Sequence, residues 1–175
     1  MALTSERIGT DRAIQPIGMI VEYSILRCSG EPGYKGWCIN PTFQRGLVWT
    51  LAQKVAWIES ILMGIGMPTI FVNRFPEEHP VYGWSEIVID GQQRLNATAE
   101  FMTDKFRVRG ELYSAQPKVF KRGFVMHDGL TPVVYCNYKT ERECAELYLR
   151  LLRSGTAHTT EEMRKAEDFI KGCRA

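Results

Sequence analysis

Histidine is scarce in this sequence, and cysteine is not arranged for metal binding. The 175 residues include three histidines and five cysteines, the cysteines lie far apart, and no Cys-x-x-Cys pair occurs. These features argue against a zinc site. Because the number of cysteines is odd and their spacings are long, they also argue against a disulfide framework. We therefore expect reduced thiols in a cytoplasmic protein.

Long apolar runs and a large net charge are also lacking. No run approaches the ~20 residues of a membrane-spanning helix, and the N-terminus lacks the pattern of a signal peptide. A net charge of +2 neither demands nor excludes nucleic acid. With 45% hydrophobic residues the chain can bury one core. We expect a single domain over residues 1–175, flexible over residues 1–13, with no membrane partner.

Helical and strand patterns are interleaved along the chain. Thr50 and Gln53 form a capping box before an amphipathic helix predicted over residues 51–63. Further helices are predicted over residues 92–102, 140–152 and 159–173, and strands over 37–39, 69–74, 81–89, 106–110 and 133–136. Residues 19–26 fit a strand or a short helix, residues 29–36, 75–80 and 154–156 are predicted loops or turns, and residues 114–130 are predicted to be irregular. This order predicts an α+β domain with a helical C-terminal part.

The stretch over residues 88–95 holds the strongest functional candidate. An apolar strand stops at Asp90 and Gly91, and the chain restarts as a helix. A helix N-terminus presents unpaired N–H groups and a positive dipole end, Gly91 permits close backbone approach, and Arg94 lies in the first turn. This geometry suits a phosphate or another anion. A plain strand-to-helix corner with an exposed Arg94 is the alternative.

A second arginine-bearing turn precedes the helix at residue 51. Gln44 and Arg45 lie there, and the two turns could form opposite walls of one anion pocket, since arginine holds phosphate through a planar fork. A surface position is the alternative for both residues. The amides of Gln92 and Gln93 could contact a base or hold an attacking water. Three roles are open for Asp90: helix N-cap, Mg²⁺ ligand or general base.

Other polar residues have two interpretations each. Glu59 and Glu100 could serve a metal or lie on solvated helix faces, and His127 with Asp128 is either a catalytic pair or two neighbours that face different ways. A basic set could contact a nucleic-acid backbone or form a solvated face; its members are Lys105, Arg107, Arg109, Lys118, Lys121 and Arg122. The four tryptophans lie in or beside apolar segments, which favours core positions over stacking platforms; they are Trp37, Trp49, Trp57 and Trp84.

Three segments resemble, in order and spacing, the motifs of the GmrSD-type N-terminal domain of the ParB and sulfiredoxin-like superfamily. They are residues 44–50, 58–64 and 88–95. The resemblance implies a small mixed sheet with packed helices and nucleotide binding at residues 90–94, with Arg45 nearby. It also implies hydrolysis of a nucleoside triphosphate in members that serve modification-dependent DNA restriction. ParB relatives bind CTP through Gly-x-x-Arg-x-x-Ala, a pattern that Gly91, Arg94 and Ala97 match.

The resemblance weakens toward the C-terminus. Residues 148–155 stand where the family has an aromatic residue, Arg-Leu-Asn and a glycine turn, and Leu152 occupies the asparagine position. If that asparagine helps to hold nucleotide or metal, this chain binds differently or has lost turnover. Gln92 stands where sulfiredoxin relatives carry a reactive cysteine, which excludes that thiol chemistry. Nuclease-active members carry a second, C-terminal domain that this chain is too short to contain, so a protein partner would supply one.

Together these patterns predict a nucleotide-binding domain with Mg²⁺-dependent hydrolysis of, or phosphate transfer from, a nucleoside triphosphate. The expected context is DNA transactions or phage–host conflict, with DNA or a second copy of the chain as further partners. The expected catalytic residues are Asp90, Gln93 and Arg94, with Asp90 as the Mg²⁺ ligand, and the expected binding residues are Gln44, Arg45, Gly91, Gln92, Arg94 and Ala97. The alternatives are a non-catalytic DNA-binding or regulatory module and a stand-alone ParB-like nuclease.

Overall fold

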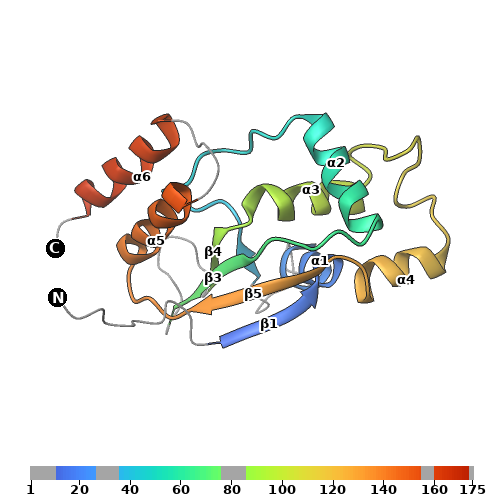
Figure 1. Ribbon diagram of the computed structural model, residues 1–175, viewed down its shortest axis with the longest axis horizontal. Helices are drawn as coiled ribbons and strands as arrows, with labels where there is room; N and C mark the ends of the chain where they lie inside the picture. The colour runs from blue at the N-terminus through green and yellow to red at the C-terminus, as the bar shows by residue number, and fades with distance from the viewer. Residues whose placement is uncertain (1–10, 27–35, 76–85, 155–159, 174–175) are drawn as a thin grey trace.

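The computed structural model describes residues 11–26, 36–75, 86–154 and 160–173 (Figure 1). These residues form a five-stranded mixed sheet and six α-helices, which confirms the predicted α+β class. The elements in chain order are β1 (Asp11–Pro16), α1 (Ile17–Val21), the π-helical turn η1 (Glu22–Leu26), β2 (Trp37–Cys38), α2 (Leu51–Leu62), β3 (Ile70–Arg74), β4 (Glu86–Asp90), α3 (Gln92–Met102), α4 (Lys118–Met126), β5 (Leu130–Cys136), α5 (Glu141–Ser154) and α6 (Thr160–Gly172).

The strand order of the sheet is β1-β5-β3-β4-β2. β1 is antiparallel to β5, and β3 is parallel to β5. β4 pairs with β3 in antiparallel fashion and with the two-residue β2 in parallel. The short β2 pairs only with Glu86 and Ile87, so within the described ranges the second half of β4 has no strand neighbour on that side.

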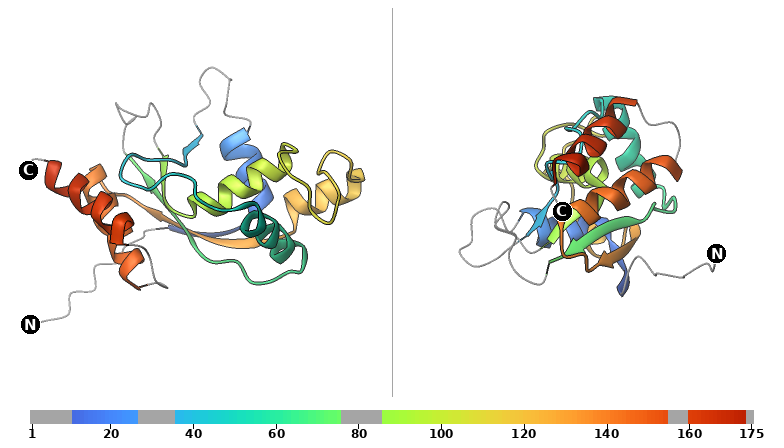
Figure 2. Two further views of the ribbon diagram at one scale, coloured as in Figure 1. Left: turned by 90° about the horizontal axis from the view of Figure 1, so that it is seen from above. Right: turned by 90° about the vertical axis from the view of Figure 1, so that its left-hand side faces the viewer.

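Helices cover both faces of the sheet. Successive side chains of a strand point to opposite faces: Val88 packs in the core formed with α1, α2, α3 and α4, whereas Ile87 and Ile89 pack in the core formed with α5 and α6. All three are fully buried. Burial on both faces explains the uninterrupted apolar run of β4. Figures 1 and 2 show α5 and α6 side by side at one end of the molecule and α4 at the other.

The predicted helices are confirmed to within a few residues. α2 begins at the predicted capping box, in which the Gln53 side chain accepts from the Thr50 N–H at 2.8 Å and the Thr50 hydroxyl accepts from the Gln53 N–H at 3.3 Å. α3 has the predicted bounds, and α5 extends two residues past the predicted end. Residues 19–26 take the helical alternative, as part of α1 and η1. α6 is seen from Thr160; the predicted cap at Thr159 lies outside the described residues.

The predicted strands are confirmed apart from one. β2, β3, β4 and β5 lie where the apolar runs are, although residues 81–85 of the run before Glu86 lie outside the description. The strand predicted over 106–110 is wrong. Arg109 (φ 52°) and Gly110 (φ 82°) are both left-handed, and Val108 and Glu111 exchange two hydrogen bonds of 3.0 Å. Two successive left-handed residues reverse the chain, so the segment is a tight turn.

The prediction that residues 114–130 are irregular is also wrong, because they contain α4 and the start of β5. α4 follows Pro117, a residue often found at helix starts. Phe124 on its inner face is fully buried, with its ring 5.7 Å from that of Phe101. Only this apolar face holds the helix on the core, since its other residues are mostly charged or exposed.

Flexibility over residues 1–13 stays a prediction, and the last three of these residues lie in the sheet. Residues 11–13 belong to β1, which pairs with β5 along its whole length. β1 is an edge strand with few apolar residues, and its Ile14 is 70% exposed, so it has no clear period-2 pattern. Residues 1–10 lie outside the described part of the chain, as do the predicted loops and turns over 29–35, 76–80 and 155–156.

Three described cysteines are buried free thiols, namely Cys38, Cys136 and Cys144. Burial raises the pKa of each thiol, that of Cys136 to about 11. A thiol that stays protonated is a poor nucleophile. No helix within the described ranges has both the length and the apolar character needed to cross a bilayer.

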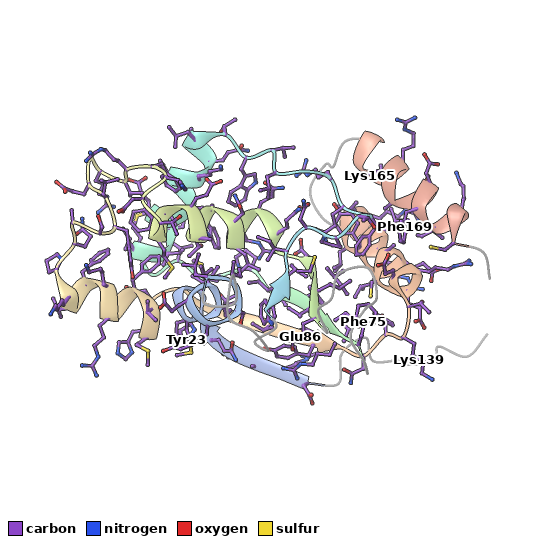
Figure 3. The ribbon with its side chains drawn as sticks, turned by 180° about the vertical axis from the view of Figure 1, so that it is seen from behind. Tyr23, Phe75, Glu86, Lys139, Lys165 and Phe169 are labelled. Carbon is purple, nitrogen blue, oxygen red and sulfur yellow. The ribbon has the colours of Figure 1, made fainter. Side chains whose placement is uncertain are left out.

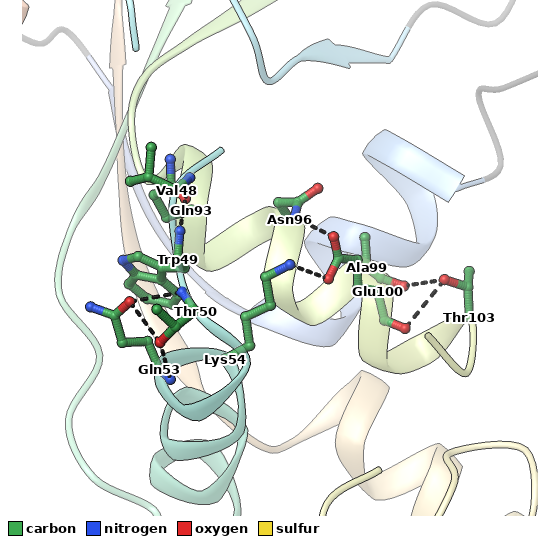
Figure 4. A network of polar contacts seen from close by, with 10 residues as sticks. All are labelled: Val48, Trp49, Thr50, Gln53, Lys54, Gln93, Asn96, Ala99, Glu100 and Thr103. Carbon is green, nitrogen blue, oxygen red and sulfur yellow. Dashed lines mark hydrogen bonds and ion pairs between the residues drawn. The ribbon is translucent and has the colours of Figure 1, made fainter. Parts of the chain in front are cut away.

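An ion pair joins α2 to α3. Lys54 Nζ lies 2.6 Å from Glu100 Oε2, and Asn96 Nδ2 donates to Glu100 Oε1 at 2.9 Å (Figure 4). Burial acts to raise the pKa of Glu100, but the hydrogen bonds from Lys54 and Asn96 outweigh it, so the pKa lies below its ordinary value of 4.5. Glu100 is therefore a structural carboxylate between two helices.

The lowered pKa predicts an acid-sensitive contribution to stability. A carboxylate whose pKa is depressed by folding stabilises the native state above its unfolded pKa, and this contribution is lost as the pH falls through the folded value. We expect Glu100→Gln to lower the free energy of unfolding by about 1 kcal/mol at pH 7 and by much less near pH 3, measured by urea unfolding. The exposed Glu146, paired with Arg142 on one helix, is the control: Glu146→Gln should change little at either pH. An equal loss for Glu100→Gln at both pH values would contradict the assignment.

Candidate functional site

The corner between β4 and α3 begins with a β-bulge. Val72 pairs with Val88 but Phe71 pairs with Asp90, so Ile89 is an extra residue on β4. Gly91 follows with φ 115°, a left-handed conformation that favours glycine. A Cβ at this position would lie 3.0 Å from Ile70 Cγ1. Backbone conformation and contact with β3 therefore both require glycine here.

Among the described residues, no side chain caps the first turn of α3. Gly91 occupies the N-cap position, and the first intrahelical bond runs from the Leu95 N–H to the Gly91 carbonyl at 2.9 Å. The N-cap role considered for Asp90 is therefore wrong, and its carboxylate Oδ2 instead accepts from Arg94 Nη2 at 2.6 Å. The absence of a capping side chain leaves the N–H groups of this turn available to an anion.

Arg94 braces this corner. Besides its ion pair with Asp90, its Nη1 donates to the carbonyl of Pro68 at 2.8 Å. Only 11% of its side chain is exposed. The alternative of an exposed arginine on a plain corner therefore does not hold.

Gln44 completes the open side of β4. Its Nε2 donates to the carbonyls of Val88 and Ile89, at 2.7 Å each, where β4 has run past the end of β2. Only 2% of the residue is exposed, so the surface alternative is wrong for Gln44. A buried amide needs such partners, and these bonds fix the Gln44 turn to the bulge.

The glutamines of α3 hold the same segment from the other side. Gln93 Oε1 accepts from the N–H groups of Val48 and Trp49 at 3.1 and 3.2 Å (Figure 4). Its Nε2 donates to the carbonyl of Gly46 at 3.0 Å. Gln92, 5% exposed, donates to Asn40 Oδ1 at 2.7 Å. Both amides are engaged by protein groups, so a role in holding water or a base would require the segment over residues 40–49 to release them.

A pocket of about 170 Å³ lies where these elements meet. Seven of the eight predicted site residues line it; Ala97, on the inner face of α3, is fully buried in the core. The complete lining consists of Gln44, Arg45, Trp49, Asp90, Gly91, Gln92, Gln93, Arg94, Tyr148 and Leu152. Two turns that are 45 residues apart in the sequence thus line one pocket, as predicted for two arginine-bearing turns that each precede a helix.

The pocket has a charged side and an apolar side. Arg45, Arg94 and the start of α3 form the charged side, where Asp90 is the only carboxylate among the lining residues. Trp49 and Leu152, with Tyr148, form the apolar side. Trp49 was assigned to the core by its apolar neighbours; its ring does pack edge-on against Trp57, with centroids 6.1 Å apart, but it also faces the pocket.

The remaining candidates lie elsewhere. Glu59 pairs with Arg109 at 3.4 Å, and His127 with Asp128 lines a separate cavity of about 410 Å³ beside the C-terminal end of α2. None of the six basic residues considered for nucleic acid lines the pocket, and α4, which carries three of them, lies at the opposite end from α5 (Figure 1). Among the residues that the structure describes, no group of three or more His, Cys, Asp or Glu side chains could hold a metal ion.

Sequence comparison identifies the family. A family model described as the GmrSD restriction endonuclease, N-terminal domain, matches residues 28–169. The chain belongs to this family. The match includes every residue that lines the pocket, so the pocket is a feature of the GmrSD N-terminal domain as this chain builds it. Comparisons with curated proteins and with solved structures return no match.

The clamp made by Gln93 predicts a local change in hydrogen exchange. Gln93→Ala removes all three bonds to residues 46–49, so we expect exchange of the Val48 and Trp49 amides to accelerate by about tenfold or more. Gln93→Glu keeps the acceptor oxygen and should preserve most of their protection. NMR-detected exchange measures both. Gln116→Ala, which removes one distant bond to the Leu112 carbonyl, is the control. Unchanged protection in Gln93→Ala would show that the clamp does not order the segment.

Proposed function

We propose that this GmrSD N-terminal domain binds a nucleoside triphosphate by its phosphate end and, with Mg²⁺, hydrolyses it or transfers its phosphate. Family membership supports a DNA-related or phage-defence role. One observation carries the nucleotide proposal: the uncapped start of α3 and two arginines from distant segments line one pocket.

The arginines offer donors to an anion. Two of the five guanidinium N–H donors of Arg94 serve Asp90 and Pro68, which leaves others for a phosphate oxygen. Arg45 lines the pocket from the facing turn. Two arginines and a helix N-terminus together provide the bidentate, charge-assisted hydrogen bonds that phosphate accepts.

The size of the pocket favours the phosphate end. Pockets that enclose a small molecule typically measure about 300–1,000 Å³, whereas this one measures about 170 Å³. A bound nucleotide would therefore place its phosphates inside and its remaining parts at the mouth.

The donor set fits a magnesium ion shared with phosphate. Mg²⁺ binds through one or two carboxylates, substrate phosphates and several waters. Asp90 supplies one carboxylate at the pocket, 43% exposed, and its Oδ1 makes no hydrogen bond with any residue in the described part of the chain. When bound, the ion would neutralise phosphate charge. As a general base in place of a metal ligand, Asp90 would accept a proton from an attacking water. The Gln93 amide is engaged by residues 46–49.

A thermal-shift panel tests this proposal. We expect at least one of ATP, GTP, CTP and their deoxy forms to raise the melting temperature in the presence of Mg²⁺, because a ligand at 100 times its Kd stabilises the native state by about 2.7 kcal/mol. Arg94→Ala should abolish the shift. Arg142→Ala, an exposed change of equal charge on α5, should retain it.

Arg94 also bonds to Pro68 and Asp90 in the free protein. The fold of the Arg94→Ala variant must therefore be checked separately. Circular dichroism should show an unchanged spectrum for the free variant. No shift with any nucleotide for the wild-type protein, or an undiminished shift for a folded Arg94→Ala, would contradict the proposal.

Leu152 favours a second candidate, a non-catalytic DNA-binding or regulatory module. It lines the pocket and is 7% exposed, so this position offers no polar side chain to a metal or a phosphate. The basic residues of α4 lie apart from the pocket, and DNA contact there would leave the pocket untouched. Lys118 and Arg122 are the exposed members of this set on α4.

This candidate predicts binding to duplex DNA that weakens steeply with salt. Each phosphate contact contributes about one unit to the slope of log K against log salt concentration. Lys118→Ala combined with Arg122→Ala should therefore lower the slope by about two, whereas Arg94→Ala should leave it unchanged. Fluorescence anisotropy over a salt series measures this. Absent or salt-independent binding would contradict the DNA-binding role.

A further inference from the structure

The last helix, α6, reaches the turn that carries Arg45. Lys165 Nζ donates to the backbone carbonyl of Gln44, 121 residues away in the sequence. One turn further along α6, the ring of Phe169 lies 5.7 Å from that of Phe43, which is fully buried. Figure 3 shows both side chains on α6. The helix therefore contacts two successive residues of the segment that leads into Arg45.

These contacts complete the fixation of Gln44. Its N–H donates to the Pro41 carbonyl at 3.1 Å, its side chain donates to β4, and its carbonyl accepts from Lys165. The carbonyl of Gln44 and the N–H of Arg45 belong to one planar peptide group. Holding that carbonyl therefore fixes the orientation of the peptide plane that precedes the Cα of Arg45.

The same helix is linked to the facing wall. Phe43 packs against Tyr148 of α5, with ring centroids 5.9 Å apart, as well as against Phe169. Tyr148 lines the pocket. The buried ring of Phe43 thus connects α6 to Tyr148, and Phe43 is also the residue before Gln44.

We propose that Lys165 is a positioning residue for the anion pocket: through the Gln44 carbonyl it holds the Arg45 turn in the conformation that binds phosphate. Lys165 is not among the lining residues, so it acts through Arg45. Hydrogen bonds from an ammonium group are stronger than neutral ones, which suits the task of holding a turn. The inference rests on the proposed nucleotide site.

The first experiment needs no ligand. Lys165→Met keeps the aliphatic stem and removes the donor, and it should accelerate amide exchange over residues 44–46 relative to wild type. Lys165→Arg restores a charged donor and should restore protection. Lys171→Met, which removes an exposed lysine paired with Asp168 on the same helix, is the matched control. Wild-type exchange in Lys165→Met would overturn the proposal, whatever the protein binds.

The second experiment measures affinity by calorimetry, with the nucleotide of the ATP, GTP and CTP panel that gives the largest thermal shift. We expect Lys165→Met to raise Kd about tenfold and Lys165→Arg to bring it back toward wild type. Combined with Arg45→Ala, Lys165→Met should add little, because a residue that acts through Arg45 has no effect once Arg45 is gone. Additive losses would mean that Lys165 acts independently of Arg45 and would overturn the positioning role.

The two failures are distinguishable. If no nucleotide binds the wild-type protein, the proposed function fails, and the exchange data alone decide whether Lys165 orders the turn. If Lys165→Met does not fold, Lys165→Leu, which also lacks a donor, replaces it in both experiments. Nucleotide binding with wild-type Kd in a folded variant that lacks the donor would contradict the inference and leave the proposed function standing.

Discussion

The site depends on the bulge in β4. The extra residue Ile89 and the early end of β2 leave carbonyl groups of β4 without a strand neighbour, and unpaired buried carbonyls are costly. The Gln44 amide pairs with two of them. This solution brings the segment over residues 40–49 against the corner, where Gln93 and Gln92 bind its backbone and Asn40. Gln44 thus takes the place of a strand neighbour of β4, and Gln92 and Gln93 hold the segment that carries it. The pocket lies between the end of β4 and this segment.

The position of α5, which supplies Tyr148 and Leu152 to the pocket, depends on a different buried amide. Asn73, fully buried on β3, donates to the Tyr138 carbonyl at 3.1 Å and accepts from its N–H at 2.7 Å. This pair fixes the connection between β5 and α5. Because α5 packs on the face of the sheet that carries Ile87 and Ile89, its residues Tyr148 and Leu152 arrive beside the end of β4. The end of β4, the segment over residues 40–49 and α5 therefore meet at the pocket, although each is held by its own polar contacts.

Local patterns predicted the elements that have a strong signal of their own. The capping box predicted α2, the turn residues Asp90 and Gly91 predicted the corner, and two arginine-bearing turns predicted a shared pocket that the structure contains. β1 and α4 were missed because one is a polar edge strand and the other buries only a narrow face. The glutamine contacts and Lys165 were out of reach for another reason. Periodicity shows which face of an element is buried, but not which distant backbone group a side chain meets, and these bonds span 44 to 121 residues.

The ion pair between Asp90 and Arg94 links the two proposed binding events, that of phosphate at Arg94 and that of a metal ion at Asp90. In the free protein each group is the partner of the other, at 2.6 Å. A phosphate bound through the remaining donors of Arg94 would therefore compete with the carboxylate for the guanidinium charge. A divalent cation on Asp90 would weaken that competition, because the carboxylate would then direct its charge to the metal. Phosphate and metal binding at this corner are therefore expected to favour each other, and by linkage the effect is reciprocal. Leu152 adds no polar group that could replace Asp90 in this exchange. In the proposed reaction, one carboxylate would thus serve first the arginine and then the metal.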